Sequence, residues 1–173
     1  QNTQLAFLDK HLKGKDEKTP LSQVTLWNLT KKSWEVLEQN ETPSWRLHSN
    51  GLASISHIEG SLIANSDLEI DVDSEVNLVH DPWRPVPALG GHLGEKPGEV
   101  NRFNIDIRSD VAVFTTPPIT KDIRLEGIPI LSLETICDRE SFDLFVALSI
   151  IPSQSENIVN QISTGALRIH HCD

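Results

Sequence analysis

The residue types that most often carry out catalysis are present in this sequence, but none stands in a recognised catalytic spacing. A serine hydrolase presents its nucleophile on a sharp turn such as G-x-S-x-G, because that elbow exposes the serine beside an oxyanion hole. The sequence contains no such turn, and its seven histidines include no H-E-x-x-H zinc motif. His170 and His171 are neighbours, so on a strand they point to opposite faces and cannot easily share one metal ion. We therefore expect surface positions for both and no metal site.

Two further groups of residues have both a chemical and a structural interpretation. Acidic residues occupy every second position from Asp67 to Glu75. On a strand this pattern gives a solvated face; a calcium site is the alternative, although the run lacks the glycine turn of an EF-hand loop. Four tryptophans could form a platform for stacking sugar rings, as in a carbohydrate-binding module, but packing in a core or interface is more usual for this residue. They are Trp27, Trp34, Trp45 and Trp83.

A third group lies within a few residues of the chain. His80 and Arg84 flank Asp81, and Asp81 is followed by a proline. A salt bridge or an Asp-Pro turn is the more usual outcome of this arrangement than direct catalysis. The residue chemistry by itself therefore describes a domain without an active site of its own.

Length, composition and charge restrict the class of protein and its partners. The 173 residues contain 15 Lys+Arg against 25 Asp+Glu, which gives a formal net charge of −10. With 38% apolar residues, the chain is an ordinary globular protein of one domain, or two at most. The excess of acidic charge would repel nucleic acid and anionic lipid, and no apolar run approaches the length of a transmembrane helix. We expect neither nucleic acid nor a membrane as a partner.

The sulfur-containing residues give two further expectations. Cys137 and Cys172 are the only cysteines, too few for a disulfide framework. Reduced thiols are then the default, so we expect a cytoplasmic protein. The sequence has no methionine, which indicates that it is a piece of a longer protein.

The spacing of apolar residues predicts one helix followed by many strands. Leu5, Leu8 and Leu12 share one face of a helix over residues 4–13, and the polar residues 14–20 form a linker. From Leu21 onward the apolar period is about two. Strands are expected at residues 24–29, 33–37, 44–48, 61–64, 68–72, 76–79, 104–108, 111–115, 123–126, 128–136, 142–151 and 166–171. Ten or more short strands without a second helix indicate an all-β sandwich or jelly roll.

Two regions of this pattern are unusual. The strand at 142–151 alternates most clearly, and its second face is partly apolar, so we expect a central strand covered on both sides. Between Val79 and Phe103 lies a loop of more than twenty residues that is rich in proline and glycine. Loops of that length in a compact domain usually serve function.

This loop is the first of several blocks that resemble a known family. Residues 80–91 read H-D-P-W-R-P-V-P-A-L-G-G, which is similar to the Y-D-P-x-x-P-V-P-x-x-G-G signature of the C-terminal domain of the X-Pro dipeptidyl-peptidase and cocaine-esterase (CocE/NonD) family. Further blocks follow in the family's order. Residues 108–119 resemble R-x-D-V-L-V-F-T-S-x-P-L, 122–127 resemble D-x-x-V-x-G, 141–148 resemble T-D-F-x-x-x-L, and 165–168 resemble G-I-L-R. Residues 7–14 are similar to the F-F-D-x-W-L-K-G helix that ends the family's α/β-hydrolase domain.

The resemblance implies a division of the chain. Residues 19–173 would form a jelly-roll β-sandwich of the galactose-binding-like type, packed on a catalytic α/β-hydrolase domain that precedes Gln1. Residues 1–18 would be the remnant of the last helix of that domain plus a linker. The family usually continues with further strands beyond the position of Asp173, so the sandwich would lack its last strands. Either the chain is cut there and forms a homodimer through the open edge, or the parent has a shorter sandwich.

The resemblance also implies which residues have a role. In the family the catalytic serine, aspartate and histidine all precede the matched helix, so this chain would contain no catalytic residue and need no cofactor. The jelly roll covers the mouth of the active site, and the loop after the Gly-Gly pair reaches the substrate pocket. By position, this assigns a substrate-pocket loop to Trp83, Arg84, Gly91, His92 and Leu93.

Two functions from different classes follow. The first is the non-catalytic C-terminal domain of a cytoplasmic serine hydrolase that acts on X-Pro peptides, esters or acyl amides. The second is an autonomous carbohydrate-binding module of jelly-roll architecture. Exposed coplanar tryptophans on one sheet face would favour the second function, whereas a long loop suited to docking would favour the first.

Overall fold

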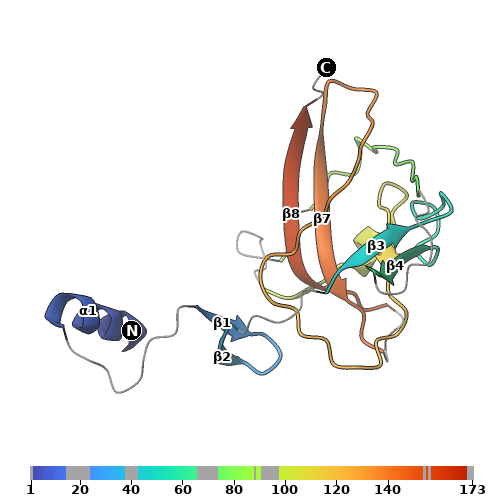
Figure 1. Ribbon diagram of the computed structural model, residues 1–173. Helices are drawn as coiled ribbons and strands as arrows, with labels where there is room; N and C mark the ends of the chain where they lie inside the picture. Colours follow the sequence, from blue (N-terminus) through green and yellow to red (C-terminus); the bar gives the residue numbers. More distant parts are fainter. Residues whose placement is uncertain are drawn as a thin grey trace. The chain divides into compact units, whose positions relative to one another are not determined.

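The computed structural model describes residues 2–14, 24–37, 43–65, 74–87, 89–90, 98–153, 155 and 157–170. The chain divides into two compact units, residues 1–42 and residues 43–173. Figure 1 shows the first unit as one helix and a short hairpin, and the second as a group of strands with a long hairpin.

The first unit contains helix α1 (Asn2–Lys13) and the antiparallel strands β1 (Thr25–Asn28) and β2 (Ser33–Val36). The helix lies where the leucine spacing predicts it. Its leucine face is exposed in this unit, which leaves an apolar stripe available for contact with another surface. The hairpin turn is fixed by the Asn28 side-chain oxygen, which accepts hydrogen bonds from the N–H groups of Thr30 and Lys31, both at 2.9 Å.

The second unit contains two three-stranded sheets. In the first sheet, β4 (Gly60–Ala64) lies between β3 (Trp45–His48), to which it is antiparallel, and β6 (Phe114–Thr115), to which it is parallel. The parallel pairing covers two rungs only, Gly60 with Phe114 and Ser61 with Thr115.

The second sheet has the order β5–β8–β7 and is built on the longest hairpin of the chain. Strands β7 (Ser141–Ile150) and β8 (Asn160–His170) are antiparallel over almost their whole length (Figure 1), and β5 (Val100–Asn101) pairs with the first residues of β8. The register shifts between Leu148 and Ser149, which is the signature of a β-bulge. A single helical turn, α2 (Phe103–Asp106), follows β5.

Buried positions in the second unit are few and partly polar. Ala53 and Val159 are the buried apolar residues among those described, whereas Ser49, Ser54 and Gln161 are buried polar residues. The Ser49 hydroxyl donates to Glu59 Oε2 at 2.6 Å, and the Ser54 hydroxyl donates to the Asn77 carbonyl at 2.8 Å. Hydrogen bonds from the Ser49 hydroxyl and the Asn50 N–H hold the pKa of Glu59 below its ordinary value. Hydrogen bonds of these polar side chains thus stabilise the turns between β3 and β4, because buried polar groups need partners.

The structure confirms the all-β class and most of the expected strands. Strands β1, β2, β3 and β6 lie within the predicted ranges, β4 and β7 each begin one residue earlier, and β8 begins at residue 160 instead of 166. The expected strand at 68–72 lies outside the described residues.

Six expected features are wrong: four of the strands, the absence of a second helix, and the central position of the strand at 142–151. Residues 104–108 are not a strand, because Phe103–Asp106 forms a helical turn held by an ion pair from Arg102 Nε to Asp106 Oδ1 at 2.7 Å. The chain therefore has a second helix. Residues 76–79, 123–126 and 128–136 are not strands either, because an alternating segment forms a strand only where a partner edge is in register. Finally, β8 rather than β7 is central in its sheet, and within the described residues β7 is an edge strand.

None of the described helices has the length and apolar character needed to cross a membrane.

A substitution at Gly60 tests how tightly β4 and β6 are packed. A Cβ atom at Gly60 would lie 2.0 Å from the Val113 carbonyl oxygen, whereas nothing lies within 4 Å of one at Gly165 in β8. We expect Gly60→Ala to lower the free energy of unfolding by about 2 kcal/mol or more, because the backbone itself would have to shift. Gly165→Ala, the matched control, should leave stability unchanged or raise it by about 0.5 kcal/mol. Urea unfolding followed by circular dichroism measures both, and equal midpoints would contradict this packing.

Candidate functional site

The candidate site is the loop that follows residue 79, and its first part is a tight turn. The N–H of Arg84 donates to the Asp81 carbonyl at 3.1 Å, and the N–H of Trp83 donates to Asp81 Oδ1 at 3.0 Å. Arg84 Nε lies 3.4 Å from Asp81 Oδ2. The predicted Asp-Pro turn and salt bridge are both confirmed. The turn leaves Trp83 90% exposed, which is a large apolar side chain at the surface.

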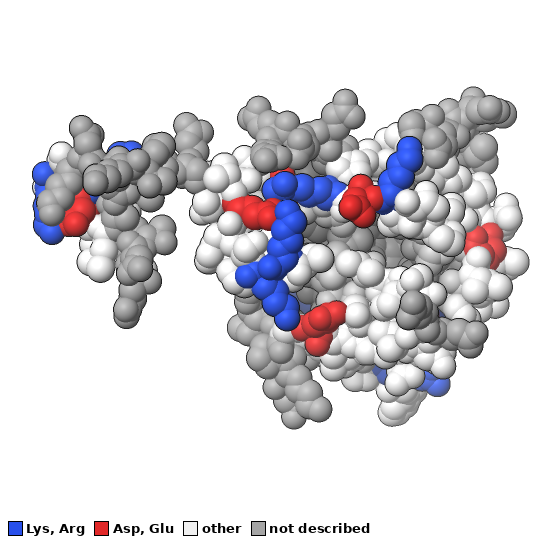
Figure 2. Space-filling view, turned by 90° about the horizontal axis from the view of Figure 1, so that it is seen from below, with Lys and Arg blue, Asp and Glu red and all other residues white. Residues whose placement is uncertain are grey.

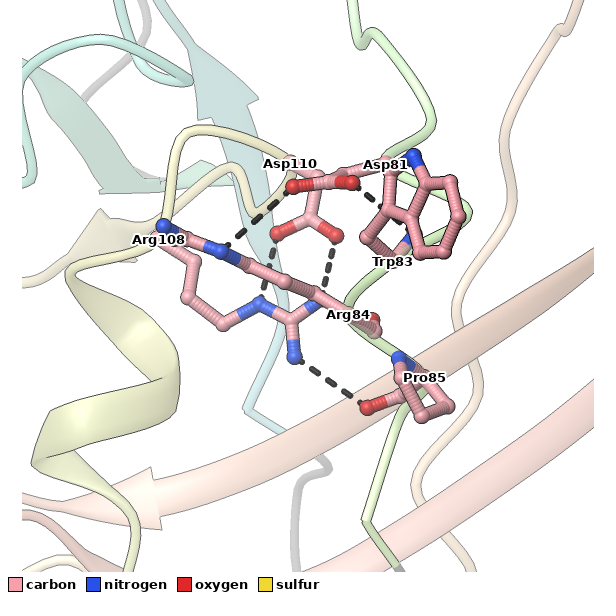
Figure 3. Close-up of polar contacts among 6 residues, drawn as sticks. All are labelled: Asp81, Trp83, Arg84, Pro85, Arg108 and Asp110. Carbon is pink, nitrogen blue, oxygen red and sulfur yellow. Dashed lines mark hydrogen bonds and ion pairs between the residues drawn. The ribbon is translucent and has the colours of Figure 1, made fainter.

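Arg108 anchors this turn to the rest of the second unit. Its Nε donates to Asp110 Oδ1 at 2.7 Å and its Nη2 donates to Asp110 Oδ2 at 2.5 Å, a bidentate pair. The same guanidinium donates to the carbonyl of Pro85 at 3.3 Å and to the carbonyl of Arg84. Figure 3 shows the two arginines and two aspartates gathered at this point, with Trp83 at their edge. One side chain therefore joins residues 108–110 to the backbone of residues 84–85.

The environment of this pair makes it strong. The side chains of Arg108 and Asp110 are each only 12% exposed. Hydrogen bonding to Asp110 raises the pKa of the Arg108 guanidinium, and hydrogen bonding from Arg108 holds the pKa of Asp110 below its ordinary value of 3.8. An ion pair shielded from water in this way is screened less than a surface pair.

Gln161 of β8 anchors the loop at a second point. Its Nε2 donates to the Leu89 carbonyl at 2.9 Å, and its Oε1 accepts from Arg102 Nη1 at 3.1 Å. Gln161 is 7% exposed. Gly90 follows Leu89 with φ +65, and a Cβ atom there would lie 2.8 Å from the Gly98 carbonyl oxygen. Only glycine fits this close approach of two backbone segments.

The charges around the site occur in pairs of opposite sign. Figure 2 shows several Lys and Arg side chains adjoining Asp or Glu on the face that it presents, while some acidic and basic side chains stand apart in wide uncharged areas. Three or more His, Cys, Asp or Glu side chains that could hold a metal ion do not come together anywhere in the described part of the chain. The arrangement is suited to positioning a loop and an exposed aromatic side chain.

The structure describes some of the predicted site residues and not others. Trp83 and Arg84 lie in the anchored turn, whereas Gly91, His92 and Leu93 lie outside the described residues, as do residues 67–73 of the acidic run and His171. His170 is exposed, as predicted. Trp27 and Trp34 contact each other edge to face, with ring centroids 5.5 Å apart and an interplanar angle of 72°. This pair is not the coplanar platform that a sugar-binding module would need.

Comparison with known proteins agrees with the motif pattern. Residues 16–173 match the family described as X-Pro dipeptidyl-peptidase C-terminal non-catalytic domain. The chain belongs to this family. No curated protein and no solved structure matches it. The X-Pro dipeptidyl-peptidase resemblance is therefore confirmed, and the family assigns to the chain a non-catalytic domain of a peptidase.

Three residues that anchor the loop of this X-Pro dipeptidyl-peptidase domain were not among the predicted site residues. Arg108 and Asp110 have a signal in the sequence, since opposite charges two positions apart in an R-S-D triplet can pair. Gln161 has none, because its contacts with Leu89 and Arg102 join residues 72 and 59 positions apart in the chain.

Replacing Arg108 tests its role as an anchor. We expect Arg108→Leu to lower the free energy of unfolding by about 2 kcal/mol, because the largely buried Asp110 carboxylate would lose its partner and the turn would lose both hydrogen bonds from Arg108. Arg168→Leu is the matched control, since Arg168 makes a similar bidentate pair with Asp143 on the exposed surface of the β7–β8 hairpin. Arg168→Leu should change the free energy of unfolding little, because exposed ion pairs contribute little to stability. Equal effects in urea unfolding would show that Arg108 is not an anchor.

The same pair gives a pH dependence. Because the pKa of Asp110 is lowered in the folded protein, its contribution to stability is present above about pH 4 and is lost as the pH falls further. The difference in unfolding free energy between the unmodified chain and Arg108→Leu should be constant from pH 7 to about pH 4.5, then shrink. A difference that persists undiminished at pH 2.5 would contradict the ion pair.

Proposed function

We propose that the chain is the C-terminal domain of a serine hydrolase of the X-Pro dipeptidyl-peptidase or acyl-esterase type, and that it packs on the α/β-hydrolase domain and shapes its substrate pocket. The observation that carries the proposal is the loop held at two points, by Arg108 at residues 84–85 and by Gln161 at Leu89, with Trp83 left exposed. A wall of a substrate pocket needs such a fixed loop and an apolar side chain.

The exposed helix α1 supports the same proposal. Leu5, Phe7, Leu8 and Leu12 are all exposed in the first unit. An amphipathic helix obtains most of its stability from packing its apolar face. This helix is then the last helix of the hydrolase domain, with residues 1–18 as its end and linker and residues 19–173 as the accessory domain. We take the accessory domain to be a jelly-roll sandwich, consistent with its two three-stranded sheets.

The expected chemistry follows from this division. The nucleophilic serine, the general base and its partner carboxylate belong to the hydrolase domain, and this chain contributes shape and exclusion of water. The substrate is a peptide, an ester or an acyl amide. The free thiol of Cys137 agrees with a cytoplasmic location.

Hydrolysis assays on the chain and on the full-length parent test the proposal. We expect the parent to hydrolyse both an X-Pro-p-nitroanilide and p-nitrophenyl acetate. The chain alone should hydrolyse neither substrate. In the parent, Trp83→Ala should lower kcat/KM about tenfold for at least one substrate. Ile136→Ala, an equally exposed position outside the loop, should not. Turnover by the chain alone would show that the catalytic serine is not confined to the hydrolase domain. If Trp83→Ala left kcat/KM unchanged for both substrates, the loop would not be part of the substrate pocket.

A further inference from the structure

A groove lies beside strand β4, and none of its lining residues belongs to the loop of the candidate site. Its volume is about 690 Å³, and it is lined by Trp45 of β3, Ser61–Ala64 of β4, residues 115–121 and Ile123. Ligand sites have volumes of about 300–1,000 Å³. The groove is bounded by a strand edge on one side and by the segment after β6 on the other.

On the edge of β4 that faces this groove, several backbone groups have no strand partner among the residues that the structure describes. The N–H of Asn65 donates to the Ser44 carbonyl, and Ala64 stands opposite Trp45 in the same register. Since hydrogen-bonding positions alternate in an antiparallel pair, residues 61, 63 and 65 point their backbone groups toward β3, and Leu62 and Ala64 point theirs away. Among the described residues, pairing on that other edge ends at Ser61 with Thr115.

Two prolines explain why the pairing ends there. Continuing the parallel ladder would require the Leu62 carbonyl to accept a hydrogen bond from the N–H of residue 117. Residues 117 and 118 are both proline, which has no N–H group. The segment after Thr115 therefore cannot serve as the next stretch of strand, and it forms the far wall of the groove instead.

The side chains of the groove define what could lie between these walls. Leu62, Ile63 and Ile119 give it apolar surface, and Trp45 provides an aromatic side chain at one end. Lys121 is the only charged residue among the described residues that line it, although the chain as a whole has a net charge of −10. A ligand with apolar side chains and one carboxylate would match this lining.

We propose that the groove binds an extended peptide, which adds to β4 as a strand with its backbone paired to Leu62 and Ala64 and a carboxylate near Lys121. The Ala64 N–H is a hydrogen-bond donor on this edge, and the Leu62 and Ala64 carbonyls are acceptors. One donor and two acceptors spaced along a strand edge suit the backbone of another strand and no other common ligand. The ligand we assign is the part of a peptide substrate beyond the scissile bond, and this source rests on the proposed function as a peptidase domain.

A pair of substitutions at one position tests the backbone pairing. Ala64→Pro removes the N–H that points into the groove, while a proline is tolerated there because that N–H makes no bond to β3. Ala64→Val enlarges the side chain and keeps the N–H. The probe is a fluorescein-labelled Val-Thr-Val-Thr-Val-Glu peptide, and its anisotropy is titrated with the 173-residue chain. We expect saturable binding, at least tenfold weaker for Ala64→Pro, within threefold of the unmodified chain for Ala64→Val, and about threefold weaker for Lys121→Gln.

Several results would overturn the peptide site. They are no saturable binding by the unmodified chain, or equal affinities of Ala64→Pro and Ala64→Val when circular dichroism shows both to be folded. Dimerisation that Ala64→Pro abolishes, without peptide binding, would assign the edge to a second copy instead.

Kinetics of the parent test the source of the peptide separately. Ala64→Pro should lower kcat/KM for Ala-Pro joined to the same hexapeptide at least fivefold, and leave kcat/KM for Ala-Pro-p-nitroanilide unchanged. An equal effect on both substrates, or on neither, would overturn the assignment to substrate. Peptide binding by the chain together with an inactive parent would instead remove the proposed peptidase function and leave the groove as a peptide site.

Discussion

The second unit depends on one constraint, the need of a largely buried guanidinium to find partners for its donors. Arg108 meets this need with both oxygens of Asp110 and with the carbonyls of Arg84 and Pro85. Loss of either member of the Arg108–Asp110 pair would leave a largely buried charge unpaired, which is costly. The turn at residues 81–85 is therefore held to residues 108–110 although no strand pairing joins them. Because Trp83 lies within this turn, the anchor also fixes the backbone that carries its exposed side chain.

The second anchor of the loop arises from the longest hairpin. Gln161 stands near the start of β8, where β5 also pairs, and reaches Leu89 on one side and Arg102 on the other. The hairpin register thus sets the position of the loop at Leu89 and Gly90. A domain with few buried apolar residues can hold a functional loop in this way, because hydrogen-bonded polar side chains fix geometry as well as packing does.

Local features of the fold were predictable from the sequence, and long-range features were not. The leucine spacing located α1, and alternation located β1 to β4 and β7, because each pattern acts over a few neighbouring residues. Alternation also suggested strands at 104–108 and 128–136, where the first became a helical turn and the second has no partner edge. The motif around residue 80 pointed to Trp83 and Arg84, which lie in the anchored turn; their role at a substrate pocket stays a prediction. The contacts of Gln161 and the free edge of Leu62 and Ala64 depend on register between distant segments, which one sequence does not specify.

Under the proposed function, this chain supplies structure to a hydrolase domain and does no chemistry itself. Complementation tests it most directly. The hydrolase domain of the parent, produced without residues 19–173, is mixed with increasing amounts of the 173-residue chain, and hydrolysis of an X-Pro-p-nitroanilide is measured. We expect the hydrolytic activity to rise with added chain until it reaches a plateau, and the chain alone to have no activity. Activity that is independent of added chain, or that resides in the chain itself, would contradict it.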